Sequence, residues 1–224
     1  MDGARLNYVP GDPRDQLAYV GFDVVRAGLV VGSGGNMSAR LLDDPDVCWV
    51  TGAGTWLDRL ERPSFVRVQI SSGEVIDDRV PPTTELALHC ATYRMRPDAQ
   101  AIVHLHPQSV LLLDVLDEPI QLLTTDHVFY LRRVATTPFK PPGSPELAGV
   151  AAAAVADGTN CVILGNHGCS VLGDTVELAH KRARNLEEAA RMTYRLLALP
   201  RAGKPRELPA SYLDLLEGDQ SVAI

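Results

Sequence analysis

Two histidines one residue apart, His104 and His106, stand at the end of an apolar run that begins at Ala101. Alternate side chains of a β-strand point to the same face, so both imidazoles could reach one metal ion. A third histidine, His167, follows another strand-like run and has Gly165 and Gly168 close by. Three histidines and a nearby carboxylate are usual in a catalytic zinc-type site, which leaves one coordination position open for substrate. The pattern therefore predicts that these three histidines bind one divalent metal.

A lone His-x-His pair often has no function, and the chain has six histidines. The surroundings favour binding, because an unpaired polar group is costly at the end of a buried strand. The carboxylate would come from Glu85, in the first turn of a helix expected over residues 84–95. A glutamate there ordinarily does no more than complement the helix dipole. If Glu85 faces the metal, it is the obvious general base, and we predict it as the catalytic acid/base.

Three turns are suited to an anion: residues 32–36 (GSGGN), 51–54 (TGAG) and 83–85 (TTE). Glycine lets backbone amides approach a ligand closely, and a helix N-terminus favours negative charge. Each could also be an ordinary turn. Neither glycine stretch is followed by Gly-Lys-Ser/Thr or has Gly-x-Gly-x-x-Gly spacing, which argues against nucleotide binding.

Composition narrows the function further. The 224 residues are 46% hydrophobic and 22% charged, with a formal net charge of −7. We expect a single domain over 1–224 with a short C-terminal tail from about 200. A net negative chain without a lysine-rich run argues against nucleic acid as a partner. Backbone amides and hydroxyls could still hold a phosphorylated substrate.

Location is inferred from what the sequence does not contain. It has no apolar stretch of membrane-spanning length and no secretion signal at its start, so no membrane association is expected. Its four cysteines are scattered without a Cys-x-x-Cys pair, which favours reduced, buried thiols in a cytoplasmic protein.

Hydrophobic periodicity predicts interleaved helices and strands. Helices are expected at 15–29, 84–95, 107–116, 146–156, 174–199 and 211–216, and strands at 36–41, 48–50, 65–70, 101–106, 161–164 and 169–172. An Asp174 to Glu177 capping box is expected to open the long helix, and residues 120–137 are expected to be rich in strand. Several strands are joined by short turns, which favours a mixed or antiparallel sheet with helices on its faces.

Six motifs in this order resemble the class II aldolase/adducin family. They are GGNMSAR at 34–40, TGAG at 51–54, PTTE at 82–85, YRMRPD at 93–98, VHLH at 103–106 and NHG at 166–168. The resemblance extends from about residue 17 to residue 199. It implies an α/β fold, a three-layer α/β/α unit with a mostly antiparallel central sheet. It also implies a homotetramer with fourfold cyclic symmetry and active sites between neighbouring subunits.

The resemblance also implies roles for individual residues. The three histidines would bind Zn²⁺, with Mn²⁺ or Co²⁺ as other candidates, and Glu85 would be the acid/base and could ligate the metal when no substrate is present. The substrate phosphate would be held by five positions: Asn36, Thr51, Gly52, Thr83 and Thr84. The partner implied is a small phosphorylated sugar.

The chain departs from the family pattern at several points. Leu105 and Pro107 replace the usual threonine and serine beside the metal histidines, and residues 124–130 replace a stretch that often carries a tyrosine on the phosphate side. Only Tyr212 is available as an aromatic residue that a C-terminal tail could send into a neighbouring site. These departures bear on the substrate more than on the chemistry.

Three functions remain open. The first is a zinc aldolase that cleaves a ketose 1-phosphate, such as L-fuculose 1-phosphate, to dihydroxyacetone phosphate and an aldehyde through a metal-stabilised enediolate. The second is a related sugar-phosphate enzyme: a dehydratase, a decarboxylase or a 4-epimerase. Epimerases tend to carry aspartate where this chain has Glu85, so epimerisation is the weakest of these. The third, a non-catalytic adducin-like interaction module, is disfavoured because all three histidines and the glutamate are present.

Overall fold

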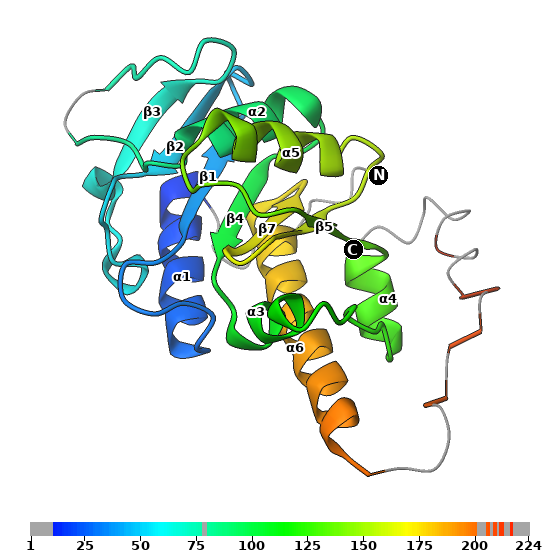
Figure 1. Ribbon diagram of the computed structural model, residues 1–224. Helices are drawn as coiled ribbons and strands as arrows, with labels where there is room; N and C mark the ends of the chain where they lie inside the picture. Colours follow the sequence, from blue (N-terminus) through cyan, green and yellow to red (C-terminus); the bar gives the residue numbers. More distant parts are fainter. Residues whose placement is uncertain are drawn as a thin grey trace.

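The computed structural model describes residues 11–77 and 80–200, together with residues 205, 206, 208, 209, 211, 212 and 216. One seven-stranded sheet runs through the described chain in the order β3-β2-β1-β4-β7-β6-β5 (Figure 1). The strands are β1 Asn36–Arg40, β2 Val47–Thr51, β3 Phe65–Gln69, β4 Ala101–Leu105, β5 Val134–Thr137, β6 Cys161–Leu164 and β7 Gly168–Gly173. All neighbouring strands pair antiparallel except β5 and β6, which confirms the expected, mostly antiparallel sheet.

Helices cover both faces of this sheet. They are α1 Pro13–Arg26, α2 Leu86–Met95, α3 Gln108–Val115, α4 Thr125–Leu131, α5 Pro145–Ala154 and α6 Val176–Ala198, with short 3₁₀ turns at Leu57–Arg59 and Arg62–Ser64. Helices α1 and α6 contact one face, and α2 and α5 pack together on the other. Helices α3 and α4 pack against α6. The arrangement is the three-layer α/β/α unit that was expected.

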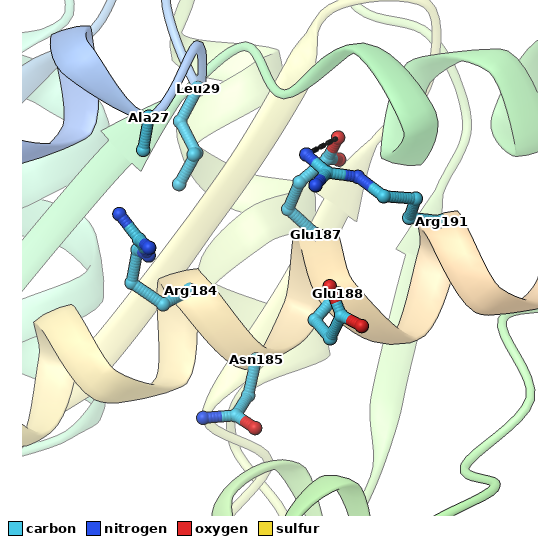
Figure 2. Close-up of a pocket in the computed structure, with 7 residues that line it drawn as sticks. All are labelled: Ala27, Leu29, Arg184, Asn185, Glu187, Glu188 and Arg191. Carbon is cyan, nitrogen blue, oxygen red and sulfur yellow. Dashed lines mark ion pairs between the residues drawn. The ribbon is translucent and has the colours of Figure 1, made fainter.

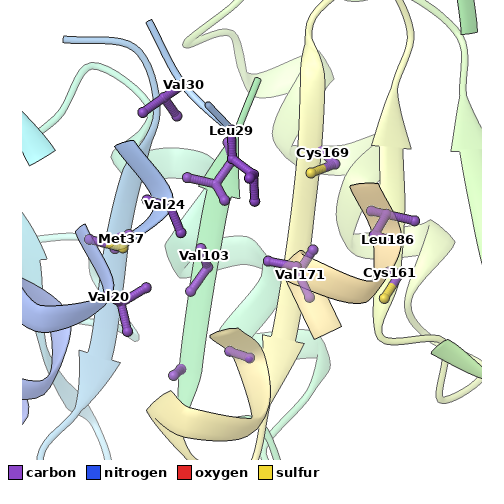
Figure 3. Close-up of a cluster of buried hydrophobic side chains, with 14 of the residues drawn as sticks. Val20, Val24, Leu29, Val30, Met37, Val103, Cys161, Cys169, Val171 and Leu186 are labelled. Atoms are coloured by element: carbon purple, nitrogen blue, oxygen red, sulfur yellow. The ribbon is translucent and has the colours of Figure 1, made fainter. Parts of the chain in front are cut away.

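Two apolar cores separate these layers. Figure 3 shows part of the first, which includes Val20 and Val24 of α1, Leu186 of α6, and Val103 and Val171 of the central strands. The second core lies between the opposite face of the sheet and helices α2 and α5. The four cysteines are buried and unpaired, as the sequence indicated.

The alternation of side chains along β4 shows on which face of the sheet His104 lies. Ala101, Val103 and Leu105 belong to the core under α1 and α6, whereas Ile102 belongs to the core under α2 and α5. Because successive side chains point to opposite faces, His104 shares the face of Ile102. It therefore points to the side of the sheet where α2 begins.

The expectation of strand over residues 120–137 was wrong for its central part. Residues Thr125–Leu131 form α4, and only Val134–Thr137 is a strand. Thr124 caps this helix by accepting a hydrogen bond from the backbone N–H of His127 at 3.2 Å. The β-branched and aromatic residues that suggested a strand instead pack α4 against α6, so tertiary contacts override local propensity.

Other boundaries differ only slightly. The cap of α6 is Thr175, whose side chain accepts from the N–H of Leu178, and not the neighbouring Asp174 that the expected capping box used. Of the helix expected over 211–216, only residues 211, 212 and 216 are described, and most of the tail beyond residue 200 lies outside the described residues. Within the described part of the chain, no helix combines the length and hydrophobicity needed to cross a membrane.

Candidate active site

The predicted metal ligands come from three parts of the fold. His104 is in β4, His106 follows the end of that strand, and His167 lies in the tight turn between β6 and β7. Glu85 is the cap residue of α2. The turn approaches β4 closely at Gly168, where a Cβ atom would lie 2.5 Å from Cδ2 of His106. Only glycine allows the His167 turn to reach the strand that carries the other two histidines.

These four side chains converge. The candidate ligand atoms of the three histidines all lie within 4.8 Å of one another. Nε2 of His104 is 3.0 Å from Nε2 of His106 and 3.0 Å from Oε2 of Glu85. Oε1 of Glu85 is 3.4 Å from Nε2 of His167. The sequence-predicted metal ligands and the predicted base therefore form one cluster.

The charge states of the cluster suit a cation. Burial, followed by the nearby His104 and His167, lowers the pKa of His106 to about 4. Burial likewise lowers the pKa of His167. Both rings are therefore neutral near pH 7, which is the form in which imidazole ligates a metal.

Glu85 is ionised in the same cluster. Burial raises its pKa, but this is outweighed by the hydrogen bond and charge of His104 and by the hydrogen bond from Asn36, so the pKa falls to about 2. Its Oε1 is buried and has no hydrogen-bond partner among the residues described.

The cluster fits a divalent metal. Four ligands at about 2.0–2.1 Å around a tetrahedral zinc are separated from one another by about 3.3–3.4 Å. The 3.0 Å between the ring nitrogens of His104 and His106, and the 3.0 and 3.4 Å from the Glu85 oxygens to ring nitrogens, are close to this value. A carboxylate oxygen without a hydrogen-bond donor is also a group that a cation satisfies.

The predicted anion turns meet beside the cluster. A cavity of about 340 Å³ is lined by residues from all three turns and from the metal cluster. Its lining residues are Ser33, Gly34, Gly35, Asn36, Gly52, Ala53, Gly54, Thr55, Thr83, Thr84, Glu85, His106, Pro142 and His167. Three of these residues, Ser33, Thr55 and Pro142, were not among the individual site residues expected from the sequence. Among the described residues this lining contains neither lysine nor arginine, so an anion held there would be bound by amides and hydroxyls.

Backbone hydrogen bonds hold two of the turns together. Gly52 forms an isolated bridge with Pro82, and the N–H of Ala53 donates to the carbonyl of Pro81 at 2.9 Å. The N–H of Thr83 donates to the carbonyl of Thr51 at 3.0 Å. Segments thirty residues apart in sequence thus form one rigid edge of the cavity.

The five predicted phosphate positions are not equivalent. Gly52, Thr83, Thr84 and Asn36 line the cavity, and Thr84 is exposed to it. Thr51 is fully buried behind the lining, where its hydroxyl accepts a hydrogen bond from the N–H of Met37 at 3.2 Å. The structure therefore brings four of these positions to the cavity and gives Thr51 a supporting contact behind it.

Asn36 has partners that the sequence analysis did not foresee. Its Nδ2 donates to Oε2 of Glu85 at 2.9 Å, and its Oδ1 lies 2.6 Å from Nε2 of His89. Behind them, Ser38 contacts both His89 and Tyr93. Glu85, His89 and Tyr93 are spaced four residues apart in the sequence, and this helical spacing could have indicated that their side chains lie in one row along α2.

A second hollow, of about 440 Å³, lies along α6 away from this cluster (Figure 2). Charged side chains dominate its lining. Arg191 lies 3.7 Å from Glu187, and Arg184 contacts Asp23 at 2.9 Å. None of the three clustered histidines lines it, so the smaller cavity is the candidate active site.

Comparison with known proteins identifies a matching family model and similar proteins. The family model "Class II Aldolase and Adducin N-terminal domain" matches residues 15–194. An L-fuculose phosphate aldolase of Methanococcus maripaludis is 32% identical over 165 residues, which are 74% of this chain and 86% of that protein. A 3-oxo-tetronate 4-phosphate decarboxylase of Pectobacterium atrosepticum is 30% identical, over 81% of this chain and 83% of its own length.

A solved structure of a similar protein has the same fold. An L-fuculose 1-phosphate aldolase superposes with a TM-score of 0.81 at 25% identity, covering 94% of this chain and 96% of the other. The likeness therefore extends over the whole three-layer unit, including the elements that carry the histidine cluster.

Proposed function

Because the chain belongs to the class II aldolase and adducin family, we propose that it is a metal-dependent aldolase acting on a ketose 1-phosphate. Its products would be dihydroxyacetone phosphate and an aldehyde, as with an L-fuculose 1-phosphate-like substrate. One observation carries the proposal: an ionised Glu85 lies among three histidines at the floor of a cavity lined by neutral hydrogen-bond donors. A sugar phosphate has the two features that such a cavity would recognise, an anionic group and oxygens that can chelate a metal.

His104, His106 and His167 would hold the metal, which we propose to be Zn²⁺, with Mn²⁺ or Co²⁺ as substitutes. A divalent ion there supplies a Lewis acid that polarises the substrate carbonyl and stabilises the negative charge of the enediolate left by carbon–carbon cleavage. The neutral state of His106 and His167 leaves their ring nitrogens free to act as ligands.

Glu85 would move the proton. Retro-aldol cleavage takes the proton of a substrate hydroxyl and leaves a carbanion that must be protonated to release dihydroxyacetone phosphate. A carboxylate with one oxygen held by Asn36 and the other without a protein donor can serve this purpose at a fixed position. Substrate binding would bring the reacting carbon to that free oxygen.

The phosphate would be bound without a cationic side chain. We propose that Asn36, Gly52, Thr83 and Thr84 contact it directly and that Thr51 supports them, since the first four line the cavity. Hydroxyl and amide donors at the start of α2 also place the anion at the positive end of a helix dipole.

Decarboxylation of a 3-oxo-tetronate 4-phosphate is the second candidate, because relatives with that name are 30% identical to this chain. Loss of CO₂ from such a substrate leaves the enediolate of dihydroxyacetone phosphate, which is also what retro-aldol cleavage of a ketose 1-phosphate leaves. The two reactions differ in the group that departs, and only aldol cleavage requires a base for a hydroxyl proton.

A substrate panel with two product assays separates these candidates. The zinc-loaded protein would be incubated with ketose 1-phosphates and with 3-oxo-tetronate 4-phosphates, and both dihydroxyacetone phosphate and the second product would be measured. An aldehyde formed in equal amount supports the aldolase, and CO₂ supports the decarboxylase. A chelator should abolish either activity, and its failure to do so would contradict the metal-dependent proposal.

We further propose that the chain is one domain with a tail from about residue 200. We propose that it acts as a homotetramer. Three apolar residues at the end of α3, the helix that follows His106, are exposed: Leu112 and Val115 in the helix and Leu116, which caps it. Such a patch is typical of a protein interface. Light scattering tests the assembly, and a fully active monomer would exclude a site shared between subunits.

A further inference from the structure

Two rows of polar side chains face each other between β1 and α2. Asn36, Ser38 and Arg40 alternate along the strand, and Glu85, His89 and Tyr93 are spaced by four along the helix. Four helical residues rise by about 6 Å and two strand residues by about 6.6 Å, so the rows remain in step. The contacts follow this register, from Asn36 with Glu85 to Arg40, whose guanidinium lies over the ring of Tyr93 at 4.5 Å.

The hydrogen bonds in these rows have a fixed direction. An ionised carboxylate only accepts, so the amide nitrogen of Asn36 must be the end that faces Glu85, at 2.9 Å. The amide oxygen is then left for His89, whose Nε2 is 2.6 Å away. This short contact requires that Nε2 carries the hydrogen.

The other nitrogen of His89 must then be bare. His89 is fully buried, and burial lowers its pKa to about 3, so the ring is neutral with a single N–H. Its Nδ1 accepts from the hydroxyl of Ser38 at 2.7 Å. The hydroxyl of Tyr93 donates in turn to Oγ of Ser38 at 2.9 Å. Each donor in the row points towards Glu85.

We propose that His89 is a positioning residue for Glu85 and that its ring tautomer determines which end of the Asn36 amide meets the carboxylate. The opposite tautomer would present a bare Nε2 to Asn36, and the amide would have to turn its oxygen towards Glu85. Two acceptors would then face each other in a buried site, which is unfavourable. Ser38 and Tyr93 oppose this reversal, because Ser38 would then donate to Tyr93 and the buried Tyr93 hydroxyl would be left without an acceptor among the described residues.

The function of the row follows from which carboxylate oxygen of Glu85 receives its hydrogen bond. It holds Oε2 of Glu85 and leaves Oε1 without a protein donor, directed at the histidine cluster. This inference rests on the proposed role of Glu85 in proton transfer. It adds His89, a buried residue that is not part of the cavity lining, as the group that sets the position of the reacting Oε1 of Glu85.

Paired substitutions at His89 test the proposal. His89→Gln keeps an N–H donor near the place of Nε2, whereas His89→Leu removes both ring nitrogens at similar volume. We expect His89→Leu to lower kcat by about 10–100-fold, the usual effect of losing an orienting partner, with KM changed less than about threefold and metal content unchanged. His89→Gln should recover most of kcat. Equal kcat in the wild type and His89→Leu, or equal losses in both variants, would overturn the proposal.

A spectroscopic measurement is independent of turnover. Long-range ¹H–¹⁵N correlation spectra of protein labelled with ¹⁵N-histidine distinguish the two neutral tautomers, and His89 is assigned by its absence in His89→Gln. The wild type should show only the Nε2–H form, and Ser38→Ala should show a mixture. An Nδ1–H ring in the wild type would contradict the proposal. Because no substrate is present, a protein inactive on all sugar phosphates would contradict the proposed function and leave this result intact.

Stability controls complete the test. His127→Gln changes another buried histidine that does not line the cavity, and it should keep the wild-type kcat even if the protein becomes less stable. If His89→Leu does not fold, Ser38→Ala removes only a hydroxyl and provides the same comparison. A Ser38→Ala variant with a single, unchanged tautomer and unchanged kcat would contradict the inference.

Discussion

Oε2 of Glu85 lies 3.0 Å from Nε2 of His104, so the predicted base and a predicted metal ligand are in direct contact. An imidazole nitrogen and a carboxylate oxygen approach this closely when a proton or a cation lies between them. Glu85 also enters the cluster from α2, on the opposite side from β4. The base can therefore be changed without altering the strand that carries the histidines.

Glu85→Gln should separate metal binding from turnover. The amide keeps the shape of the side chain but can neither ionise nor accept a proton, so we expect kcat to fall by about 10²–10⁴-fold. Metal content, measured by atomic emission, should stay near one ion per chain because the three histidines remain. Near-normal turnover would assign the base to another residue.

The histidines themselves should divide into two groups. His104→Ala and His167→Ala each remove one of the three converging ring nitrogens and should reduce bound metal to a small fraction of the wild-type content. His127→Ala, a buried histidine outside the cluster, should retain the full metal content. His89 and His180 are also expected to be dispensable for metal. Loss of metal in the His127 variant would show that the assay reports folding instead of ligation.

Phosphate recognition should depend on Thr84. This threonine lines the cavity at the start of α2 and is exposed to it. Thr84→Leu should raise KM for phosphorylated ketoses by at least about tenfold, because a lost hydrogen bond to a charged group costs about 1.5–3 kcal/mol. Thr84→Ser keeps the hydroxyl and should stay close to the wild type. Equal cleavage of unphosphorylated ketoses would indicate that another acidic group occupies these turns.

Much of this site could be predicted from sequence because its signals are local. Alternation along β4 placed His104 and His106 on one face, and His167 was identified by its position after a strand-like run with glycines close by. The partners of Asn36 could not be found in this way, since they depend on the register between β1 and α2. Likewise, nothing local distinguished the buried Thr51 from the exposed Thr84, and the β-prone residues of α4 concealed a helix that forms by packing on α6.

Acid should destabilise the metal-free protein, partly through His89. The unfolded chain takes up a proton on this histidine near pH 6.5, whereas the folded protein resists it until about pH 3. The unfolded state therefore binds more protons between these values, and the free energy of unfolding falls as the pH falls, by up to about 1.4 kcal/mol per pH unit. Urea unfolding at pH 6.5 and 5 should show a shallower fall in His89→Gln. An identical fall in both proteins would contradict the buried, neutral state of His89.

Glu187 of α6 should stabilise the segment that carries His106. Its carboxylate accepts from the N–H of Ser109 at 3.1 Å, from the hydroxyl of Ser109 at 2.8 Å and from the N–H of Val110 at 3.2 Å. The cap residue of α3, Pro107, makes no side-chain cap of its own, so this helix N-terminus depends on a residue 78 positions away in sequence. Figure 2 shows Glu187 beside Arg191, with Glu188 next to it on α6.

Glu187→Gln should therefore lower the free energy of unfolding by about 1–3 kcal/mol, because it places an amide N–H among buried donors and removes a charge from the helix N-terminus. Since α3 begins two residues after His106, metal affinity should weaken as well. Glu188→Gln, a change at the exposed neighbour, is the matched control and should alter neither quantity. Urea unfolding of the metal-free variants measures the stability, and competition with a chromogenic chelator measures the affinity. Equal stability of the two variants would show that α3 does not need the carboxylate.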